Sequence, residues 1–299
     1  MVFFWILLGL AALLAAFCFF LASFSLGGKR QTLTEARAWQ AAHYDVSWYD
    51  RAEKKDYTVR SFDGYVLHAQ LLAGPAPSGK YIILSHGYTD NRIGSLKYAK
   101  MYLDLGFQVI LYDLRGHGEN APACCTYSVR ERKDLAALIA DTRARYPDLR
   151  RLGLHGESLG AATSVAVLEG KPPVDCVVAD CGFSEIGSVM RAGLKNMHLP
   201  GFLIGPVSLC VKIRCGSFYR DMRPIDSLRQ NDIPILFIHG AQDDFIPPAH
   251  SQAMARATKG FSMVRLTEGA GHAQSILTSP EKYRGFVESF LADPAVRGR

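Results

Sequence analysis

Charged residues are missing from the start of this chain, because residues 2–26 contain no Asp, Glu, Lys or Arg. A cleaved signal peptide begins with a basic region, has a shorter apolar core and ends at a small-x-small cleavage site, yet no lysine or arginine precedes this stretch. The absence favours an uncleaved anchor over a cleaved signal. A helix of this length can cross a hydrocarbon layer of about 30 Å, so we expect residues 1–27 to form a single transmembrane anchor.

Several function classes lack their usual sequence signals in the rest of the chain. The formal net charge is +6 over 299 residues, and lysines and arginines are scattered among acidic residues, which argues against nucleic acid as a partner. No residue cluster has metal-ligand spacing and no glycine-rich phosphate loop occurs, so we expect neither a metal nor another cofactor. We find no internal repeat and no low-complexity segment beyond the apolar start.

Cysteine pairs two residues apart, which a zinc site needs, do not recur in the sequence. Cys18 lies inside the apolar stretch, and the other six cysteines are Cys124, Cys125, Cys176, Cys181, Cys210 and Cys215. An even number permits disulfides without requiring them, and we expect free thiols in a reducing compartment. Cys210 and Cys215 are the one pair that we expect to form a bridge if the domain is exported.

The first cations after the apolar stretch are Lys29 and Arg30, with Arg37 a little further on. By the positive-inside rule, they predict that the rest of the chain lies on the cytoplasmic side of the cell membrane. Three cations are a small bias, and an extracytoplasmic orientation stays open.

The whole chain is 48% hydrophobic and long enough to bury one large core or two ordinary ones. Alternating residues at 57–61 and 65–72, around Asp63-Gly64, predict a β-hairpin. Short apolar runs typical of strands buried on both faces follow at 81–84, 108–112, 152–154, 176–179, 235–238 and 263–266. Helical stretches at 95–105, 130–145, 159–169, 250–257 and 280–291 lie between most of them. This alternation predicts an α/β fold with a mostly parallel sheet and helices on both faces.

Two segments fall outside this alternation. Residues 28–56 predict a helical neck, whose aromatic residues either lie at the membrane interface or pack onto the domain. Residues 184–231 separate two strands by far more than a crossover helix requires, and we expect a helical lid. The lid either lines an acyl-sized pocket, with its cations facing water or anionic lipid, or merely covers the sheet edge. Its apolar residues include Met190, Leu194, Met197, Leu199, Phe202, Leu203, Ile204, Val207 and Leu209.

A serine between two glycines, in the motif Gly-Glu-Ser-Leu-Gly at residues 156–160, directly follows the apolar run 152–154. This order predicts a strand, a sharp turn and a helix, with glycines removing Cβ atoms that would collide where strand and helix come closest. The Ser158 hydroxyl is then expected to project outward. The motif alone is weak support for catalysis, because glycine and serine are common residues.

Partners for this serine lie after two further strands, at the sheet edge where ligands gather in parallel sheets. Asp243 follows the run 235–238, and His272 follows the run 263–266. Serine, acid and then histidine is the chain order of an α/β-hydrolase. We predict Ser158 as nucleophile, His272 as general base and acid, and Asp243 as the group that orients the imidazole and stabilises its charged form.

Donors for a developing oxyanion are predicted at two backbone positions. The N–H of Leu159 follows the nucleophile, and the N–H of Tyr88 follows His86 and Gly87 at the end of another strand. Losing one such donor costs about 2.7–4 kcal/mol of transition-state stabilisation.

From about residue 57 onward the chain resembles α/β-hydrolases of the serine aminopeptidase-like and esterase-like group, with the membrane-anchored bacterial members closest. The resemblance implies an α/β-hydrolase domain over residues 57–299 and is specific for fold and triad, not for a substrate. Asn120 departs from the pattern, because relatives often carry serine there, and we expect no catalytic consequence. The supporting motifs are Ser-His-Gly-Tyr at 85–88, Asp-Leu-Arg-Gly-His-Gly at 113–118, the serine motif, His-Gly-Ala-Gln-Asp-Asp-Phe-Ile-Pro at 239–247 and Gly-Ala-Gly-His at 269–272.

Other residues compete for these roles. Asp244 adjoins Asp243, and Asp180 ends another strand where some hydrolases carry the acid, but motif context favours Asp243. The remaining histidines are expected to order loops, pack or lie at the surface. They are His43, His68, His86, His117, His155, His198, His239 and His250.

The triad and the apolar insertion together predict a membrane-anchored serine hydrolase that cleaves a carboxylic ester through an acyl-enzyme. Its expected partners are the membrane and a small acyl ester or lipid-like substrate. An aminopeptidase-like amide hydrolase is one alternative, and it needs an acidic group such as Glu157 or Glu185 to hold a substrate amine. A non-catalytic scaffold that binds a lipid or a partner is the other, and the intact triad argues against it.

Overall fold

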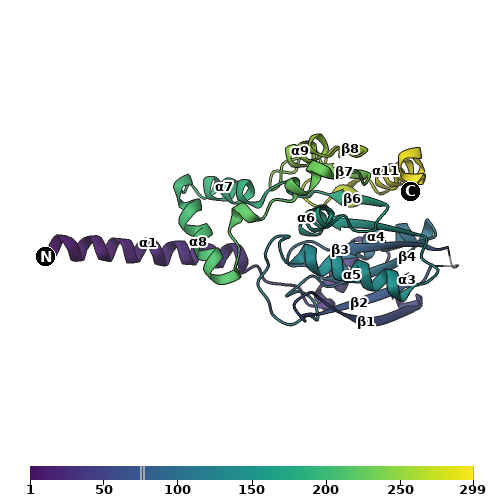
Figure 1. The fold of residues 1–299 in the computed structure, drawn as a ribbon, viewed down its shortest axis with the longest axis horizontal. Coiled ribbons are helices and arrows are strands. Elements are labelled where there is room, and N and C mark those ends of the chain that lie inside the picture. Colours follow the sequence, from purple (N-terminus) through teal and green to yellow (C-terminus); the bar gives the residue numbers. More distant parts are fainter. Residues whose placement is uncertain (75, 77, 299) are drawn as a thin grey trace.

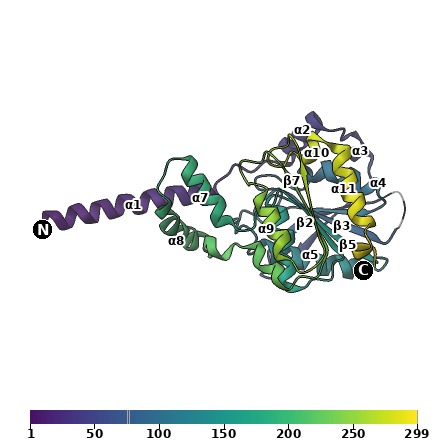
Figure 2. The same cartoon turned by 90° about the horizontal axis from the view of Figure 1, so that it is seen from above.

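The computed structural model describes residues 1–74, 76 and 78–298, and within them all the strands belong to one sheet (Figures 1 and 2). Their order is β1-β2-β4-β3-β5-β6-β7-β8. β1 pairs antiparallel with β2, as does β2 with β4, and the remaining neighbours are parallel. The strands are β1 Lys54–Arg60, β2 Val66–Leu72, β3 Lys80–Ser85, β4 Gln108–Tyr112, β5 Arg151–Glu157, β6 Cys176–Asp180, β7 Ile235–Gly240 and β8 Ser262–Thr267.

Helices lie on both faces of this sheet, as the alternation predicted (Figure 2). The α-helices are α1 Val2–Leu26, α2 Leu33–His43, α3 Ser47–Arg51, α4 Leu96–Asp104, α5 Glu131–Arg145, α6 Leu159–Ala166, α7 Ile186–Asn196, α8 Ile204–Cys215, α9 Ala249–Ala257, α10 Ser275–Thr278, α11 Pro280–Ala292 and α12 Pro294–Arg297. The 3₁₀ helices are η1 Arg92–Ser95, η2 Val167–Gly170, η3 Gly201–Leu203, η4 Tyr219–Asp221 and η5 Pro224–Gln230.

Two hydrophobic cores form, one on each face of the sheet. Successive strand residues point to opposite faces, so Ile83 of β3 joins the core beneath α5 and α6, whereas Ile82 and Leu84 join the core beneath α4 and α11. The predicted hairpin and the predicted strands are confirmed. One detail is wrong: the run 263–266 was expected to be buried on both faces, but β8 lies at the sheet edge and is mostly half-buried.

The segment before the sheet packs against the domain. α2 begins at a capping box, in which Thr32 and Glu35 satisfy each other's backbone N–H groups. Tyr44, Trp48 and Tyr49 pack against the core beneath α4, which favours the packing interpretation of these aromatics.

The apolar helix α1 extends away from the body, and α7 and α8 lie beside its C-terminal half (Figures 1 and 2). It is 25 residues long with a mean hydropathy of 2.6, so its length and composition suit a membrane span. Its residues Cys18, Leu21, Ala22 and Leu26 are buried, whereas residues 2–17 are exposed. α1 therefore has a protruding half and a half that packs against α8, within the predicted lid.

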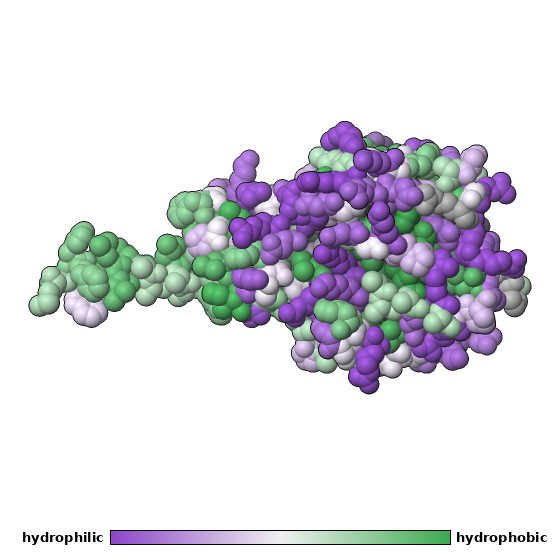
Figure 3. Space-filling view, in the orientation of Figure 1, coloured by the Kyte–Doolittle hydropathy of each residue, from purple (hydrophilic) through white to green (hydrophobic). Residues whose placement is uncertain are grey.

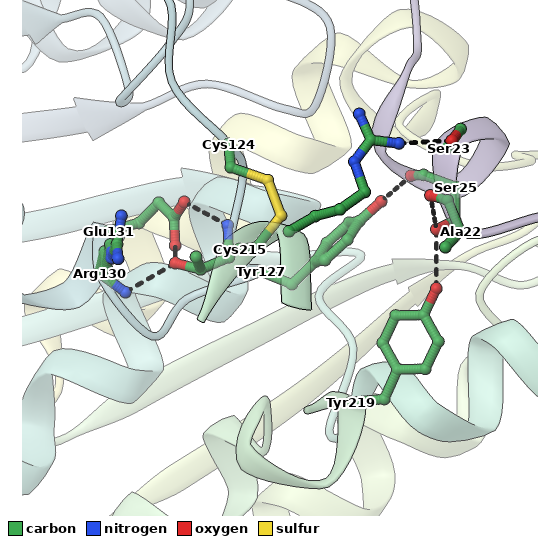
Figure 4. The surroundings of a disulfide bond; sticks show 11 residues. Ala22, Ser23, Ser25, Cys124, Tyr127, Arg130, Glu131, Cys215 and Tyr219 are labelled. Carbon is green, nitrogen blue, oxygen red and sulfur yellow. Dashed lines mark hydrogen bonds between the residues drawn. A yellow bond between two sulfur atoms is a disulfide. The ribbon is translucent and has the colours of Figure 1, made fainter. Parts of the chain in front are cut away.

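The cysteine predictions are wrong in one respect. A disulfide joins Cys124 to Cys215, whose Cα atoms lie 5.6 Å apart, within the range that such bonds require (Figure 4). Neither a bridge between Cys210 and Cys215 nor a full set of free thiols is observed. Cys124 lies in the loop after β4 and Cys215 ends α8, so the bond ties the lid to the body of the domain. No local pattern marked these two residues, because 91 positions separate them.

Candidate active site

Ser158 sits on a tight turn between β5 and α6. Its backbone has φ of 53° and ψ of −111°, and residues other than glycine rarely adopt a positive φ. A Cβ on Gly156 would lie 2.2 Å from the backbone of Gly160, and a Cβ on Gly160 would lie 2.0 Å from the Ser85 carbonyl oxygen. Both glycines are therefore needed for strand and helix to approach so closely.

The structure brings Ser158, Asp243 and His272 together. Oγ of Ser158 lies 3.0 Å from Nε2 of His272, and Nδ1 of the same ring lies 2.7 Å from Oδ2 of Asp243. These residues follow β5, β7 and β8, whose carboxyl ends all point to the same end of the sheet because the strands are parallel. A hydroxyl, a base within hydrogen-bond reach and an acid that orients the base make up the geometry of nucleophilic catalysis.

The charge of Asp243 is held in place by several donors. Its Oδ1 accepts hydrogen bonds from the N–H groups of Phe245 and Ile246, at 3.1 and 2.8 Å. Burial alone would raise the pKa of Asp243, but hydrogen bonds from His239 and His272 outweigh it and leave that pKa well below its usual range. The carboxylate therefore remains ionised and can stabilise an imidazolium at His272.

The competing acids lie elsewhere. Asp244 is exposed, and no contact joins it to His272 in the described residues. Asp180 is fully buried beneath the site, where Tyr98 donates to its carboxylate at 3.1 Å. Burial and the neighbouring Glu157 raise the pKa of Asp180 to about 6, so its environment disfavours the charge that an orienting acid needs.

The two predicted oxyanion donors flank the serine. Leu159 begins α6, and Tyr88 follows Gly87, at which a Cβ would lie 3.7 Å from the Ser158 Cβ. Neither amide donates to another group in the described part of the chain. His86 orders this loop, because its ring contacts the Gly87 carbonyl oxygen at 2.7 Å and accepts from the Leu114 N–H at 2.9 Å.

An apolar cavity of about 270 Å³ opens on one side of Ser158. The predicted lid residues Met190, Leu194, Met197, Ile204 and Val207 line it. The other predicted ones do not: Leu203 is buried in the core, Leu199 packs beside it, and Phe202 and Leu209 are exposed. The full lining is Leu21, Phe24, Ser25, Tyr88, Tyr127, Ser158, Leu159, Phe183, Ile186, Val189, Met190, Gly193, Leu194, Met197, Ile204, Val207, Tyr219, Phe245 and Ile246.

A second, polar cavity of about 650 Å³ also borders Ser158. Its polar and charged lining includes Gln31, Gln40, His43, Asp90, Lys97, Glu157, His272 and Gln274. The nucleophile therefore lies between an apolar and a polar compartment.

The two acids predicted to hold a substrate amine, Glu157 and Glu185, already have cationic partners. Glu157 lies 2.5 Å from Nζ of Lys97, and both side chains are buried. Glu185 pairs with Arg223 and lies 3.6 Å from Arg191. Neither carboxylate is free to hold an ammonium group.

The remaining histidines have packing or loop-ordering contacts where the structure gives them any. His155 lies between the hydroxyls of Tyr102 and Tyr283, and His239 contacts Ser251 and the Ile246 carbonyl. Asn120 donates from its amide to the backbone of Asp113 and Leu114 and accepts from the His68 N–H. His250 accepts from Ser184, while His43 contacts the Trp39 carbonyl and His117 that of Arg115.

Comparison with known proteins identifies relatives along most of the chain. The profile of the family described as serine aminopeptidase, S33, matches residues 76–198. A Bacillus subtilis (strain 168) protein of uncharacterized function, YqkD, is 30% identical over 247 residues, which cover 81% of each chain. The chain belongs to the S33 family of α/β-hydrolases.

One further relative and one structural neighbour are named esterases. The esterase YjfP of Escherichia coli (strain K12) is 24% identical over 64% of this chain and 80% of its own length. The Pyrococcus furiosus esterase Pf2001 superposes with a TM-score of 0.68 and 25% identity, covering 81% of this chain and 91% of that one. Family membership supports a hydrolase function for this chain. None of these relatives is described as membrane-anchored, so the anchor stays a prediction.

Two groups of site residues escaped the sequence analysis. Leu21, Phe24 and Ser25 of α1 line the apolar cavity, and Gln31, Gln40 and His43 around α2 line the polar one. The only local signal was weak: Ser23 and Ser25 interrupt an otherwise apolar helix near its C-terminal end.

Proposed function

We propose that this hydrolase cleaves carboxylic esters through an acyl-enzyme formed on Ser158. The supporting observation is the continuous relay from Ser158 through His272 to Asp243, with contacts of 3.0 and 2.7 Å. Ser158 Oγ attacks the ester carbonyl carbon while its proton passes to Nε2 of His272. The N–H groups of Tyr88 and Leu159 stabilise the tetrahedral oxyanion.

The second half of the reaction uses the same groups in reverse. Collapse of the tetrahedral intermediate breaks the bond to the alcohol oxygen, which takes the proton from the His272 imidazolium. Water then attacks the acyl-enzyme, with His272 as its base, and releases the carboxylic acid and free Ser158. The apolar cavity suits the acyl group, and its volume is near the lower end of the range for small-molecule sites, about 300–1,000 Å³.

An ester suits the site better than an amino-acid amide. An aminopeptidase needs an unpaired carboxylate for the substrate ammonium, whereas Glu157 and Glu185 are both engaged by cations. The family name keeps amide hydrolysis as the second candidate. We also propose that α1 is a single-pass anchor, because its 25 residues reach about 37 Å at about 1.5 Å per residue, enough for a hydrocarbon layer of about 30 Å.

The test uses the full chain purified in detergent, with Ser158→Ala as the matched control. We expect hydrolysis of p-nitrophenyl acyl esters, labelling of Ser158 by a fluorophosphonate, and a loss of at least about 10³-fold in kcat for the variant. Faster hydrolysis of amino-acid amides than of esters would select the peptidase. A folded wild type that neither labels nor turns over, and a Ser158→Ala chain that binds lipid unchanged, would establish the non-catalytic scaffold instead.

A further inference from the structure

We propose that α1 is part of the substrate site, and that the hydrolase draws lipid esters sideways from the bilayer that α1 crosses. This inference rests on the proposed function and goes beyond it. It names the substrate class as lipid esters resident in the membrane and assigns α1 a role in binding the acyl chain.

The first observation is that polar contacts hold the end of α1 against the site (Figure 4). The Tyr127 hydroxyl donates to the Ser25 carbonyl oxygen, and the Ser25 hydroxyl lies 2.7 Å from that of Tyr219. Just after the end of α1, the Gly28 N–H donates to the Tyr88 hydroxyl at 3.2 Å. A helix that served only as a tether would not need contacts with residues lining the apolar cavity.

The second observation is that α1 supplies one wall of that cavity. Leu21, Phe24 and Ser25 line it together with Ser158 and lid residues such as Met190. Leu21 is buried, whereas Phe24 is 68% exposed, so Phe24 lies where the cavity opens at the side of α1. An acyl chain that reaches Ser158 through this opening passes along α1.

The third observation is the length of the protruding half of α1. Residues 2–17 are exposed and reach about 24 Å, short of the hydrocarbon thickness of about 30 Å. The hydrocarbon edge therefore falls near residue 21, and any tilt of the helix moves it further along the chain. At that level α1 is already flanked by α8, so the lid dips into the membrane surface.

The lid exposes apolar side chains, as a segment that enters the membrane surface requires. Phe202 and Ile213 are 68% and 72% exposed, and Met197 and Leu209 are also exposed. Apolar surface continues from α1 onto the adjoining part of the body, whereas hydrophilic residues dominate further away (Figure 3). Arg214 donates to the Ser23 hydroxyl, which lies just beyond the inferred hydrocarbon edge.

The polar cavity completes the fit to a lipid ester. It also borders Ser158 and is lined by Asp90, Lys97 and Glu157. A lipid whose acyl chain lies along α1 would place its polar alcohol portion there, with the ester carbonyl at the nucleophile. The two cavities therefore suit an amphiphile whose apolar end lies in the apolar cavity and whose polar end lies in the polar cavity.

The first experiment compares acyl-chain selectivity of full-length variants in phosphatidylcholine vesicles. We expect Leu21→Trp, which fills the cavity wall, to lower the ratio of kcat/KM for p-nitrophenyl palmitate over p-nitrophenyl acetate at least tenfold. Leu14→Trp, on the protruding half of the same helix, should keep the wild-type ratio. If Leu21→Trp does not fold, Phe24→Ala and its control Phe20→Ala form a second pair, because both side chains are exposed.

The second experiment tests the membrane surface of the lid. We expect Phe202→Asp combined with Ile213→Asp to lower the rate on vesicle-embedded palmitate ester relative to the rate on acetate ester at least fivefold. Phe62→Asp, an exposed phenylalanine on the β1–β2 turn, should leave that ratio unchanged. Equal ratios in Leu21→Trp and Leu14→Trp, or in the Phe202→Asp/Ile213→Asp double variant and Phe62→Asp, would overturn the inference. Absent acetate hydrolysis and absent fluorophosphonate labelling of the wild type would instead overturn the proposed function.

Discussion

Asp243 places its Oδ2 2.7 Å from Nδ1 of His272, whereas the next residue, Asp244, is exposed and makes no contact with that ring in the described residues. Two adjacent residues of the same chemistry thus have different surroundings. The difference comes from the turn after β7, in which the N–H groups of Phe245 and Ile246 hold one carboxylate inward.

The adjacent pair gives a matched test of the acid. We expect Asp243→Asn to lower kcat by about 10³- to 10⁴-fold, because the amide stabilises the wrong imidazole tautomer and cannot stabilise the imidazolium. Asp244→Asn should change kcat less than twofold. Ester hydrolysis by the two purified variants measures both effects, and equal losses would exclude Asp243 as the orienting acid.

The Cys124–Cys215 disulfide is expected to stabilise the lid against the body. It closes a loop of 91 residues, for which chain entropy gives a stabilisation of about 4.6 kcal/mol. Cys124→Ser should therefore lower the midpoint of thermal unfolding by several degrees, while Cys210→Ser, which removes a free and half-buried thiol, should not. Mass spectrometry of unreduced peptides checks the bond, and a free Cys124 thiol in protein isolated without reductant would contradict it.

The same bond bears on the side of the membrane. Disulfides persist in oxidising compartments, so the bonded pair favours an extracytoplasmic domain, whereas Lys29 and Arg30 favour a cytoplasmic one. A disulfide persists only in an oxidising compartment, whereas a few cations only bias the orientation of the anchor. We therefore expect a membrane-impermeant fluorophosphonate to label Ser158 in intact cells. Labelling only after lysis would restore the cytoplasmic prediction.

The glycines at the nucleophile turn give a test of folding. Gly160→Ala places a Cβ 2.0 Å from the Ser85 carbonyl oxygen, and we expect a loss of stability above about 4 kcal/mol or no folded protein. Gly285→Ala, in the interior of α11 with open space at its Cβ, should instead stabilise by up to about 1 kcal/mol. Thermal melts of both variants decide the matter, and a Gly160→Ala chain with the wild-type midpoint would contradict this geometry.

Buried neutral histidines are expected to make the fold acid-sensitive. Burial lowers the pKa of His86 to about 4 and the pKa values of His117 and His155 to about 3. The unfolded chain, with histidine pKa values near about 6.5, binds more protons, so each histidine makes the free energy of unfolding fall as pH drops from about 6.5 toward about 4. Burial also raises the pKa values of Asp90 and Asp180 to about 6, which opposes this trend over part of the range.

A single substitution isolates one of these contributions. His155→Gln should reduce the slope of unfolding free energy against pH by about 1.4 kcal/mol per pH unit between about pH 6 and 4. His198→Gln, at an exposed position, should leave the slope unchanged. Urea denaturation of the two variants across this range measures both slopes, and identical slopes would contradict the assignment to His155.

Local pattern, together with the resemblance to α/β-hydrolases, predicted the sheet, its helices and the three residues of the relay. Strand and helix periodicities are properties of neighbouring residues, and the carboxyl ends of parallel strands meet at one edge whatever the details of packing. Ser158, Asp243 and His272 could therefore be proposed together although they are far apart in the chain.

Only the tertiary structure decided what surrounds that relay. Ser25 meets Tyr219 across 194 positions, and Cys124 meets Cys215 across 91, and no local periodicity records contacts of such range. The sequence presented α1 as an anchor and residues 28–56 as a neck. Docking of α1 against α8 and of α2 against η1 made these segments walls of the two cavities, because side-chain packing between distant elements exists only after the chain has folded.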